Sequence, residues 1–583
     1  MKWKKKGLTR TAAKPLGTLG VYDLEWHRET LKVTHCGVRD ASGYRCHKTV
    51  EEMLQDCLSA GGWWFAHAGG SYDMVQLFPT ILAHRDWHVT AAFSGVAAVI
   101  VRIRTDDGRE AAFGDSAMLL KAKLADIGKI IGLDKGNLIE AENAGWKEVR
   151  DYNERDCEIL YVGLHLFERR LQDLGGQLRP TLASCAMALF RASYLSRDIR
   201  TNLTANQLAR LAYTASRVEI FRPSCTNANY YDINSSFPFS MTFPCPGEVT
   251  RVSKRWTGHE LALVEATVTV PECYLPPLPV RVENAVYHPT GTWQGWYSGV
   301  DLIEAKKAGA TIERVHRAIH FAEWNDLTSY ARDIYDRRLR AKKEGNKLDD
   351  MTYKLLANGL YGKFAENPLK EEIVVRPPKV PKEQGARMVM PGVWSVPVLR
   401  EIPHEHVAAP VIITSRSRHL LRKGLARALE QGEIYYCDTD SVICQGELPT
   451  GEKLGEWKLE TRVKSGQFLA PKLYAVTKEQ KDASAPERID VRAKGFRGAT
   501  WREFLLLAAG EVAKVESFSR VRGMLAEAGR TGELEPKRGY VEKRWLGTTR
   551  PKRCPDGENN TRAWTIDELR EDRGWDKKTK KSG

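Results

Sequence analysis

Metal-binding cysteine pairs and long apolar segments are both missing from this sequence. The eleven cysteines lie singly along the chain without one CxxC pair, so a zinc ribbon or an iron–sulfur site has no support. The longest apolar run, at about Val96 to Val101, is far shorter than the ~18 residues of a membrane span. We therefore expect reduced thiols in an intracellular protein without a membrane helix.

One short segment with two histidines, His404-Glu405-His406, is a weak candidate for a metal-binding site. The stretch is bounded by prolines, and we expect a solvated loop there. Residues 1–14 hold six basic side chains, no acid and no following apolar segment, so they are not expected to be a secretory signal. The sequence has no internal repeat and no low-complexity block apart from the basic ends.

Positive charge is what the sequence has in excess. Of its 583 residues, 89 are Lys or Arg and 74 are Asp or Glu, which gives a net charge of +15. With 42% hydrophobic residues, the chain can form folded cores, and its length suggests about four structural units. The basic excess favours a polyanionic partner, with nucleic acid first.

The order of the expected elements divides the chain near Gly175-Gly176. Strands at 19–25 and 61–67 alternate with helices at 116–132 and 146–171, which predicts an α/β domain. The remaining elements are expected as helices at 180–215, 328–364 (interrupted near 345–346) and 411–431, and as extended segments at 218–233, 262–298 and 433–444. Residues 363–410 hold eight of the 26 prolines, which disfavours a helix, and 373–375 is expected to pair with 388–398 as a hairpin.

The segment YCDTDS (436–441) is the sharpest local signal. It places Asp438 and Asp440 two residues apart, between two apolar strands. Two like charges in a half-buried place are costly unless a cation lies between them. An ordinary solvated turn is the alternative for this segment taken alone.

A second acid at a strand end strengthens the metal hypothesis. Asp232 ends an extended segment and is followed by a polar turn, Phe237 and Pro238. Held beside the acidic turn, Asp232 would complete a carboxylate cluster for Mg²⁺, of the kind that activates an attacking oxygen and neutralises a leaving pyrophosphate.

Cations follow on a helix between these two segments. Lys354, Asn358 and Tyr361 share one helical face, while Leu356 and its apolar neighbours lie on another and are expected to pack. A lysine on a rigid helix can bind a triphosphate as a point charge. Further basic residues precede it, Lys342 among them, although a basic helix alone is usually a solvated face.

Together, the three segments resemble motifs A, B and C of family B DNA polymerases, in the family's order. The residues of these motifs are similar to those of the small terminal-protein-primed polymerases of phages and linear plasmids, above all in KLLANGLYGKFA at 354–365. PKLY at 471–474 resembles their KxY motif, and AKG follows at 493–495. The resemblance covers nearly the whole chain and is weakest beyond about residue 500.

The N-terminal third resembles the 3′–5′ exonuclease domain of the same family. YDLE at 22–25 is similar to its first motif, HAGGSYD at 67–73 to its second, and YNERD at 152–156 to its third. Asp115-Ser116 and Lys135-Gly136 resemble two lesser motifs. The resemblance therefore implies synthesis and proofreading of DNA by one chain.

The resemblance implies roles for individual residues. The polymerase acids and metal ligands would be Asp232, the Ile233 carbonyl, Asp438 and Asp440, and the exonuclease metal ligands Asp23, Glu25, Asp73 and Asp156, with Tyr152 and Lys135 beside them. The nucleotide would be bound by Phe237, Lys342, Lys354, Asn358 and Tyr361. DNA would be bound by Tyr213, Lys472, Tyr474 and Lys494. The cofactor would be Mg²⁺, two ions per active site, with Mn²⁺ as a substitute.

Several positions depart from the family pattern. Ala68 stands where the second exonuclease motif usually has Asn, a contact to single-stranded DNA, so the hold on a frayed 3′ end is weakened. Phe237 replaces a tyrosine that rejects a 2′-hydroxyl and keeps its bulk, so deoxyribonucleotide selectivity should persist. Motif B has Gly359 for Ser, and Tyr213 to Ser216 replaces YxGG without its glycines, which alters backbone freedom near DNA.

The implied fold is α/β and α+β: a ribonuclease H-like exonuclease domain, then a right-hand polymerase with two palm insertions. The expected parts are a basic tail (1–18), exonuclease (19–175), linker and palm with motif A (176–249), first insertion of the terminal-protein-docking type (250–322), fingers (323–362), second insertion of the strand-displacement type (363–410), palm with motif C and KxY (411–500), and thumb with a basic C-terminus (501–583).

The resemblance implies DNA template, primer strand and dNTPs as partners, and action as a monomer in the cytoplasm of a bacterial host. Priming by a terminal protein is favoured, with ordinary 3′-hydroxyl primers as the alternative. Three other classes fit the residues less well. A reverse transcriptase would carry YxDD, a stand-alone nuclease would not need motifs A to C, and a non-catalytic DNA-binding protein would not need seven acids that match two active sites.

Overall fold

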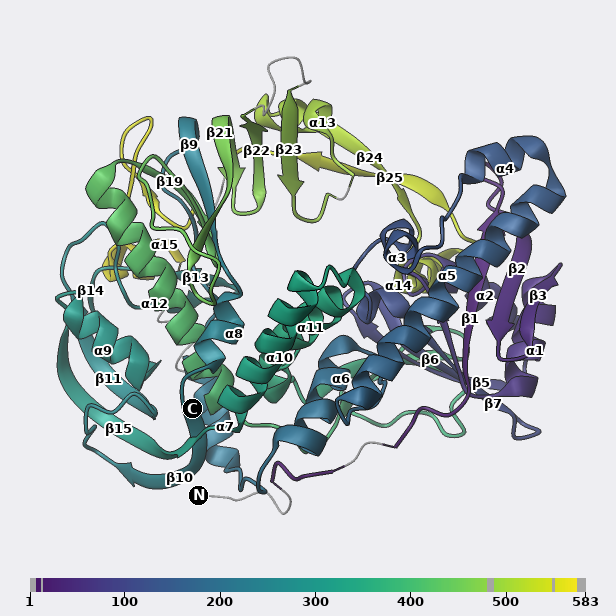
Figure 1. Cartoon of the computed structure of the whole chain (residues 1–583), viewed down its shortest axis with the longest axis horizontal. Helices are drawn as coiled ribbons and strands as arrows, with labels where there is room; N and C mark the ends of the chain where they lie inside the picture. Colours follow the sequence, from purple (N-terminus) through teal and green to yellow (C-terminus); the bar gives the residue numbers. More distant parts are fainter. Residues whose placement is uncertain (1–6, 12–13, 480–486, 497, 548–550, 574–583) are drawn as a thin grey trace.

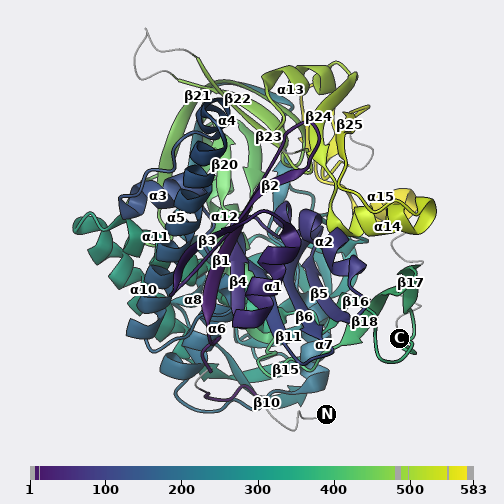
Figure 2. The ribbon, with the colours of Figure 1, turned by 90° about the vertical axis from the view of Figure 1, so that its right-hand side faces the viewer.

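The computed structural model describes residues 7–11, 14–479, 487–496, 498–547 and 551–573 (Figure 1). Two large sheets dominate it, and a helical hairpin of residues 326–359 lies between them in this view. In Figure 2 the N-terminal part, in purple and blue, lies in front of the rest. The molecule is therefore a mixed α/β protein of several parts, as predicted.

Among the described residues, ten strands form the first sheet in the order β17-β18-β16-β5-β6-β7-β4-β1-β2-β3. Its centre is parallel, because β1 (Leu19–Trp26) pairs with β4 (Trp63–Ala66), which pairs with β7 (Glu110–Asp115). The strands antiparallel to their neighbours include β2 (Val33–Asp40), β3 (Gly43–His47), β5 (Trp87–Ser94) and β6 (Ala97–Thr105). The predicted strands at 19–25 and 61–67 are confirmed.

Helices cover both faces of this first sheet. α1 (Val50–Ala60) and α2 (Asp73–Ala83) pack in one core, and α3 (Leu124–Ile131) and α5 (Trp146–Asp173) pack in another, with α4 (Leu138–Ala144) against α5. The predicted helix at 146–171 is confirmed. The continuous helix expected at 116–132 is wrong, because the Asp115 side chain accepts from the amide of Ala117 and closes a separate short turn, Ser116–Met118.

The proline-rich segment adds strands to this sheet. β16 (Leu369–Val375) pairs with β5 on one side and with β18 (Val393–Leu399) on the other. The expected pairing of 373–375 is confirmed, but 388–398 is not one strand. β17 (Arg387–Met390) turns back at Pro391-Gly392, where Gly392 has a positive φ of 76°, and pairs with β18. This segment therefore links the second half of the chain to the N-terminal sheet.

The second sheet has the described strand order β23-β22-β21-β9-β20-β19-β8. Its strands are β8 (Val218–Ile220), β9 (Ser224–Ile233), β19 (Ile434–Asp438), β20 (Ser441–Cys444), β21 (Trp457–Ala470), β22 (Leu473–Lys478) and β23 (Arg488–Ala493). α12 (Ala408–Gln431) shares a core with this sheet, and α8 (Ser236–Met241) follows β9. The predicted pair of strands around the acidic turn is confirmed.

A smaller sheet, β10-β15-β11-β14, follows motif A in sequence. Its strands are β10 (Cys245–Ser253), β11 (Ala262–Val270), β14 (Gly291–Ser298) and β15 (Thr311–Trp324), with the pair β12 (Val280–Val282) and β13 (Ala285–Tyr287) and the helix α9 (Gly299–Lys307). α9 is fastened to α12 by a buried group in which Asp301 accepts from Arg418 at 2.9 Å and lies 3.0 Å from His419.

The helical hairpin consists of α10 (Asp326–Lys343) and α11 (Lys347–Gly359). Gly345 has a positive φ of 68° in the turn between them, and the Asn346 side chain caps α11, so the predicted interruption is confirmed. Leu356, Leu360 and Phe364 are buried, as expected. A 3-10 turn, Tyr361–Ala365, ends the segment.

The helix expected over 180–215 is broken into three parts. α6 (Leu182–Leu189) continues as a π-helical turn, Phe190–Tyr194, and α7 (Leu203–Ala212) starts anew. The chain is extended between them, because Ile199 pairs as a bridge with Leu8. Leu8 is fully buried, so the basic N-terminus is not a free tail over residues 7–11.

The C-terminal part contains two described strand pairs and three helices. They are α13 (Trp501–Ala508), β24 (Val512–Phe518), α14 (Val521–Thr531), β25 (Arg538–Arg544), β26 (Cys554–Pro555), β27 (Thr561–Arg562) and α15 (Ile566–Arg573). The basic end at 577–581 lies outside the described residues. Within the described ranges, no helix is long and apolar enough to cross a membrane.

The expected solvated loop at 404–406 is wrong. His406 is 3% exposed, and its Nε2 lies 2.8 Å from the Pro246 carbonyl. Glu405 accepts from Arg210 at 2.6 Å, and His404 lies 3.2 Å from a Glu366 oxygen. The three side chains therefore join three different neighbours, and they do not converge on one point.

Candidate active sites

The first acidic site lies between β1 and α5. Asp23 and Glu25 alternate along β1 and so face the same side of the sheet, and Asp156 projects from α5. Ligand oxygens of these three acids lie within 4.8 Å of one another, and they are the one such group among the described residues. The structure thus brings together three of the four acids that the three exonuclease motifs predicted, namely those of the first and third motifs.

Burial and mutual repulsion raise the pKa values of this group. Burial, followed by the charges of Glu25 and Asp156, raises the pKa of Asp23 well above its usual range. Burial is also the main cause that raises the pKa of Glu25 to about 8. Three acids packed this closely favour a bound cation over three separate charges.

Lys135 and Tyr152 complete the surroundings of Asp156. Lys135 forms an ion pair with one Asp156 oxygen, and its ammonium lies 4.8 Å from the centre of the Tyr152 ring. The other oxygen, Oδ1 of Asp156, is buried and has no hydrogen-bond partner among the described residues. An unpartnered buried carboxylate oxygen beside two more acids fits a hard divalent cation such as Mg²⁺.

The predicted fourth acid, Asp73, lies next to this group but outside it. It is the first residue of α2 and is 4% exposed, and Oδ1 accepts from the amide of Leu24 at 3.2 Å. Burial raises its pKa to about 7. Asp73 therefore lies beside β1, close enough that its charge helps to raise the pKa values of Asp23 and Glu25.

The loop before Asp73 is held by Asp115. The buried Asp115 carboxylate accepts from the amides of Gly70 and Ala68, and burial raises its pKa to about 6. Ala68 has a positive φ of 62°, a conformation that asparagine adopts more easily than alanine. The backbone at position 68 thus keeps the shape that suits the family's usual residue, although the side chain is missing.

The second acidic site lies where β9, β19 and β20 meet. Asp232 is the cross-strand partner of Ser441, and Asp438 is paired with the same serine across the tight turn. The amide of Asp440 donates to the Asp438 carbonyl at 2.7 Å, and the amide of Ile233 donates to the Asp440 carbonyl at 2.8 Å. Asp232, Asp438 and Asp440 are thus brought to one end of the sheet.

The electrostatics of this second site are uneven. Burial, then the charge of Asp440, raises the pKa of Asp232 to about 7, and burial, then Asp438, raises that of Asp440 to about 6. Asp438 instead accepts from Lys472 at 2.7 and 2.9 Å and from the Tyr436 hydroxyl at 3.2 Å. Asp232 and Asp440 are therefore the acids with uncompensated charge, which fits them as ligands for Mg²⁺.

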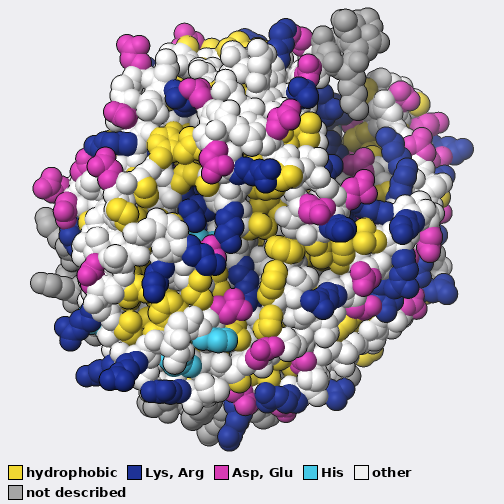
Figure 3. All heavy atoms as spheres, turned by 60° about the vertical axis from the view of Figure 1, so that its left-hand side comes forward, with side chains coloured by type: hydrophobic (Ala, Val, Ile, Leu, Met, Phe, Trp, Pro, Cys, Tyr) yellow, Lys and Arg dark blue, Asp and Glu magenta, His cyan; other side chains and the backbone are white. Residues whose placement is uncertain are grey.

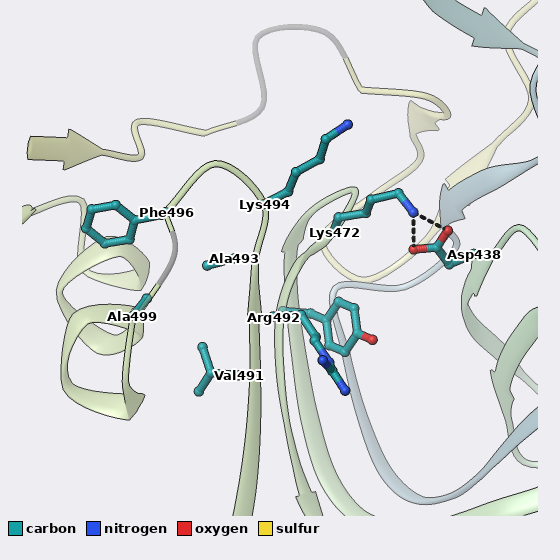
Figure 4. Close-up of a pocket in the computed structure, with 10 residues that line it drawn as sticks. Asp438, Lys472, Val491, Arg492, Ala493, Lys494, Phe496 and Ala499 are labelled. Carbon is teal, nitrogen blue, oxygen red and sulfur yellow. Dashed lines mark hydrogen bonds and ion pairs between the residues drawn. The ribbon is translucent and has the colours of Figure 1, made fainter. Parts of the chain in front are cut away.

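A cavity of about 450 Å³ opens beside Asp438 (Figure 4). Three of the predicted DNA-binding residues line it: Lys472, Tyr474 and Lys494. Figure 4 shows the Lys472 ammonium at the Asp438 carboxylate and the Lys494 side chain on the neighbouring strand segment. Arg492 also lines the cavity, so basic side chains surround the one acid there.

An aromatic pair joins α8 to the 3-10 turn that follows the helical hairpin. The rings of Phe237 and Tyr361 stack with centres 4.5 Å apart and planes 22° apart. Lys354 is close enough that its charge acts on Asp232. Asn358 is exposed, and its side chain donates to the Lys354 carbonyl at 2.9 Å.

Two other predicted residues are Lys342 and Tyr213. Lys342 is exposed near the end of α10 and forms no ion pair with a described residue. Tyr213 follows α7, and its carbonyl accepts from Arg281. Arg338, also on α10, bridges Asp350 at 2.8 Å and the Ser235 hydroxyl at 3.2 Å.

Sequence reasoning missed the side chains that support the acids. Asn153, adjacent to Tyr152, donates to Asp23, and Tyr436 donates to Asp438. Asn153 and Tyr436 both lie inside the recognised motifs, and this position was the signal that could have identified them as partners of the acids. Charge on the face shown in Figure 3 is mixed, with Lys and Arg spread among acidic side chains.

A known protein-family model matches the middle part of the chain. The family model described as DNA polymerase type B, organellar and viral, matches residues 133–392. This match confirms the resemblance to family B DNA polymerases that the motifs indicated.

Particular relatives come from fungi and phages. The chain is 28% identical over 369 residues to a probable DNA polymerase of Ascobolus immersus, covering 57% of this chain and 30% of that protein. It is 25% identical over 457 residues to the DNA-directed DNA polymerase of Enterobacteria phage PRD1, covering 72% and 76%. The matches span only 30% to 40% of the length of the fungal relatives.

The fold is that of Bacillus phage phi29 DNA polymerase, with which the chain is 30% identical over 189 residues. The solved complex of that enzyme with primer-template DNA and incoming nucleotide matches with a TM-score of 0.70, covering 90% of this chain and 99% of that one at 18% identity. The described part of the chain therefore has the mixed α/β multidomain fold of that polymerase.

Proposed function

We propose that the chain is a DNA-directed DNA polymerase with a 3′–5′ proofreading exonuclease. The observation that carries the proposal is the presence of two separate acidic groups, one beside each of the two large sheets, among residues of the motifs that resemble the family's. The first site (Asp23, Glu25, Asp156) is the exonuclease site, and the second (Asp232, Asp438, Asp440) is the polymerase site.

In the polymerase site, Asp232 and Asp440, with Asp438 and the Ile233 carbonyl, would hold two Mg²⁺ ions. Bound Mg²⁺ would supply charge neutralisation and alignment for phosphoryl transfer. Lys354 and Lys342 bind the triphosphate, and Phe237 and Tyr361 stack beside the nascent pair, with Asn358 one helical turn away. Lys472, Tyr474, Lys494 and Tyr213 hold the primer and template strands.

In the exonuclease site, Asp23, Glu25 and Asp156 would hold Mg²⁺, with Asp73 next to them beside β1. Tyr152 lies one helical turn before Asp156 and orients the attacking water. Lys135 neutralises part of the acidic charge, because its ammonium pairs with Asp156. Mn²⁺ is expected to substitute in both sites, since both offer oxygen ligands.

The proposal extends to the kind of primer that the enzyme uses. Residues 250–322 and 363–410 interrupt the palm sequence at the places of two insertions, one that docks a terminal protein and one that supports strand displacement. We therefore propose protein priming by a monomer that replicates a phage, plasmid or mobile-element genome inside a bacterial host cell. Extension of ordinary 3′-hydroxyl primers is the second candidate, because an insertion can persist after its use is lost.

Two variants test the division of labour. Asp440→Ala should abolish primer extension and spare exonuclease activity, and Asp23→Ala should do the reverse, because the two sites lie on different sheets. Loss of both activities in either properly folded variant would contradict the assignment.

A second experiment tests the primer. The enzyme is incubated with Mg²⁺, dNTPs and a linear template, with and without an oligonucleotide primer and a candidate terminal protein. A covalent nucleotide–protein product supports protein priming. Extension from the oligonucleotide alone supports the second candidate.

A further inference from the structure

Asn153 lies behind the exonuclease site, fully buried between α5 and the first sheet. Its Nδ2 donates to Oδ2 of Asp23 at 2.8 Å and to the Asp23 carbonyl at 3.1 Å. One amide group therefore fixes both the backbone and the carboxylate of a single acid. Its helical neighbours Tyr152 and Asp156 face the site itself.

Tyr44 on β3 fixes the orientation of that amide. Its hydroxyl donates to Oδ1 of Asn153 at 2.9 Å. Because Oδ1 accepts from a donor, Nδ2 is the end that faces Asp23, and both polar atoms of the Asn153 side chain have partners. Buried polar groups that are fully partnered hold one geometry.

Gly37 provides the space for this contact. It is the cross-strand partner of Asp23 in the β1–β2 pair. A Cβ at this position would overlap the Asn153 amide oxygen and lie 2.9 Å from the Tyr44 ring. The strand position opposite the acid is thus empty of side chain, and Asn153 fills it from the helix.

We propose that Asn153 is a positioning residue of the exonuclease site, held by Tyr44 and admitted by Gly37, which presents the Asp23 carboxylate to the bound divalent cation. The proposal rests on the proposed exonuclease function. Hydrogen bonds from neighbouring side chains orient the carboxylates that ligate metals, and their loss typically costs about 10- to 100-fold in metal affinity or activity. A residue that only fastened α5 to the sheet would change stability and leave metal affinity unchanged.

The test measures Mn²⁺ binding to the full-length chain by calorimetry. All variants carry Asp440→Asn, which weakens the polymerase site so that the remaining binding reports the exonuclease site. Asn153→Ala should raise the dissociation constant for Mn²⁺ by about 10- to 100-fold. Tyr44→Phe, which removes one hydroxyl, should raise it less, and Gly37→Ala should resemble Asn153→Ala.

Activity gives a second readout in the chain with Asp440 intact. The Mn²⁺ concentration for half-maximal hydrolysis of a single-stranded oligonucleotide should rise with the calorimetric constant. The KM for the oligonucleotide and the rate of primer extension should stay unchanged. Arg150→Ala, an exposed change on the same helix, is the matched control.

Parent affinity for Mn²⁺ in Asn153→Ala would overturn the proposal, and so would unchanged Mn²⁺ binding in Asp23→Ala. If Asn153→Ala does not fold, Tyr44→Phe decides by the same criterion. A parent chain that binds Mn²⁺ through Asp23 yet hydrolyses no DNA would contradict the exonuclease function and leave the positioning role supported by the binding data.

Discussion

The ammonium group of Lys472 lies 2.7 and 2.9 Å from the two carboxylate oxygens of Asp438. The lysine comes from the turn between β21 and β22, where it has a positive φ of 63°, and its amide donates to the Tyr436 hydroxyl at 3.0 Å. Backbone and side chain thus both point Lys472 at the acidic turn. A residue expected to contact the primer is also the nearest compensating charge of the polymerase site.

Lys472→Ala is therefore expected to lower primer extension by about tenfold or more, because a charge-assisted contact worth about 1.5 kcal/mol is lost at a site with excess negative charge. Lys472→Arg should retain part of the activity. Steady-state extension of a primed template measures the effect, and single-strand exonuclease activity is the internal control. Full extension activity in Lys472→Ala would show that the ion pair has no part in synthesis.

Selection against ribonucleotides should depend on the stacked pair Phe237 and Tyr361. Under the proposed function, the Phe237 ring would occupy the family position that blocks a 2′-hydroxyl, and the Tyr361 ring, stacked on it with centres 4.5 Å apart, would hold it in place. Phe237→Val should raise ribonucleotide incorporation relative to deoxyribonucleotide by about 100-fold, on the order of 3 kcal/mol of discrimination. The measurement is kcat/KM for paired rNTP and dNTP substrates. Phe237→Tyr is the matched control and should keep the parent ratio.

The carboxylates were predictable from sequence because short-range spacing fixes them. A strand followed by a two-residue turn brings Asp438 and Asp440 together in any hairpin, and the family motif adds Asp232. The separation of Asp73 from the other three exonuclease acids was not predictable, since it depends on how the loop 67–72 folds around Asp115. Sequence distance also hid the contact of Lys472 with Asp438, which requires the register of β21 and β22.

The larger errors in the fold came from pairing between distant segments. Ile199 is extended because Leu8 pairs with it across more than 190 positions, and nothing near 199 indicates this. The addition of β16 to the first sheet likewise depends on β5, a strand from the N-terminal part of the chain. Local patterns predicted the elements well where their partners were close in sequence.

Stability should fall as the pH drops from about 6.5 toward 4, in part through His406. Burial lowers the pKa of His406 to about 4, although backbone hydrogen bonds oppose the shift. Below its ordinary pKa of about 6.5, the unfolded chain binds a proton that the folded chain does not, so folding is progressively disfavoured until His406 itself titrates. The loss reaches about 3 kcal/mol for this residue.

His406→Gln should therefore flatten the pH dependence of the thermal unfolding temperature between pH 6.5 and 4, even if it lowers that temperature at pH 7. His27→Gln, at an exposed position, is the control and should keep the parent slope. An unchanged slope in His406→Gln would assign the acid sensitivity to other buried groups, such as His288, whose pKa burial lowers to about 3.

Arg520, which precedes α14, contacts the loop that leads into Asp73. Its guanidinium lies 4.8 Å from the centre of the Tyr72 ring and donates to the Ser71 carbonyl, and Tyr72 also packs edge-on against Phe518.

A cation–π contact of this kind contributes about 1 kcal/mol, equivalent to about a fivefold change in an equilibrium constant. Arg520→Ala should therefore lower hydrolysis of a single-stranded oligonucleotide by about fivefold, mainly through a higher KM, because the loop carrying Ala68 loses its support. Primer extension on a short template should be unaffected. Arg530→Ala, exposed on α14, is the control, and equal loss of both activities in Arg520→Ala would mean that the contact stabilises the C-terminal part as a whole.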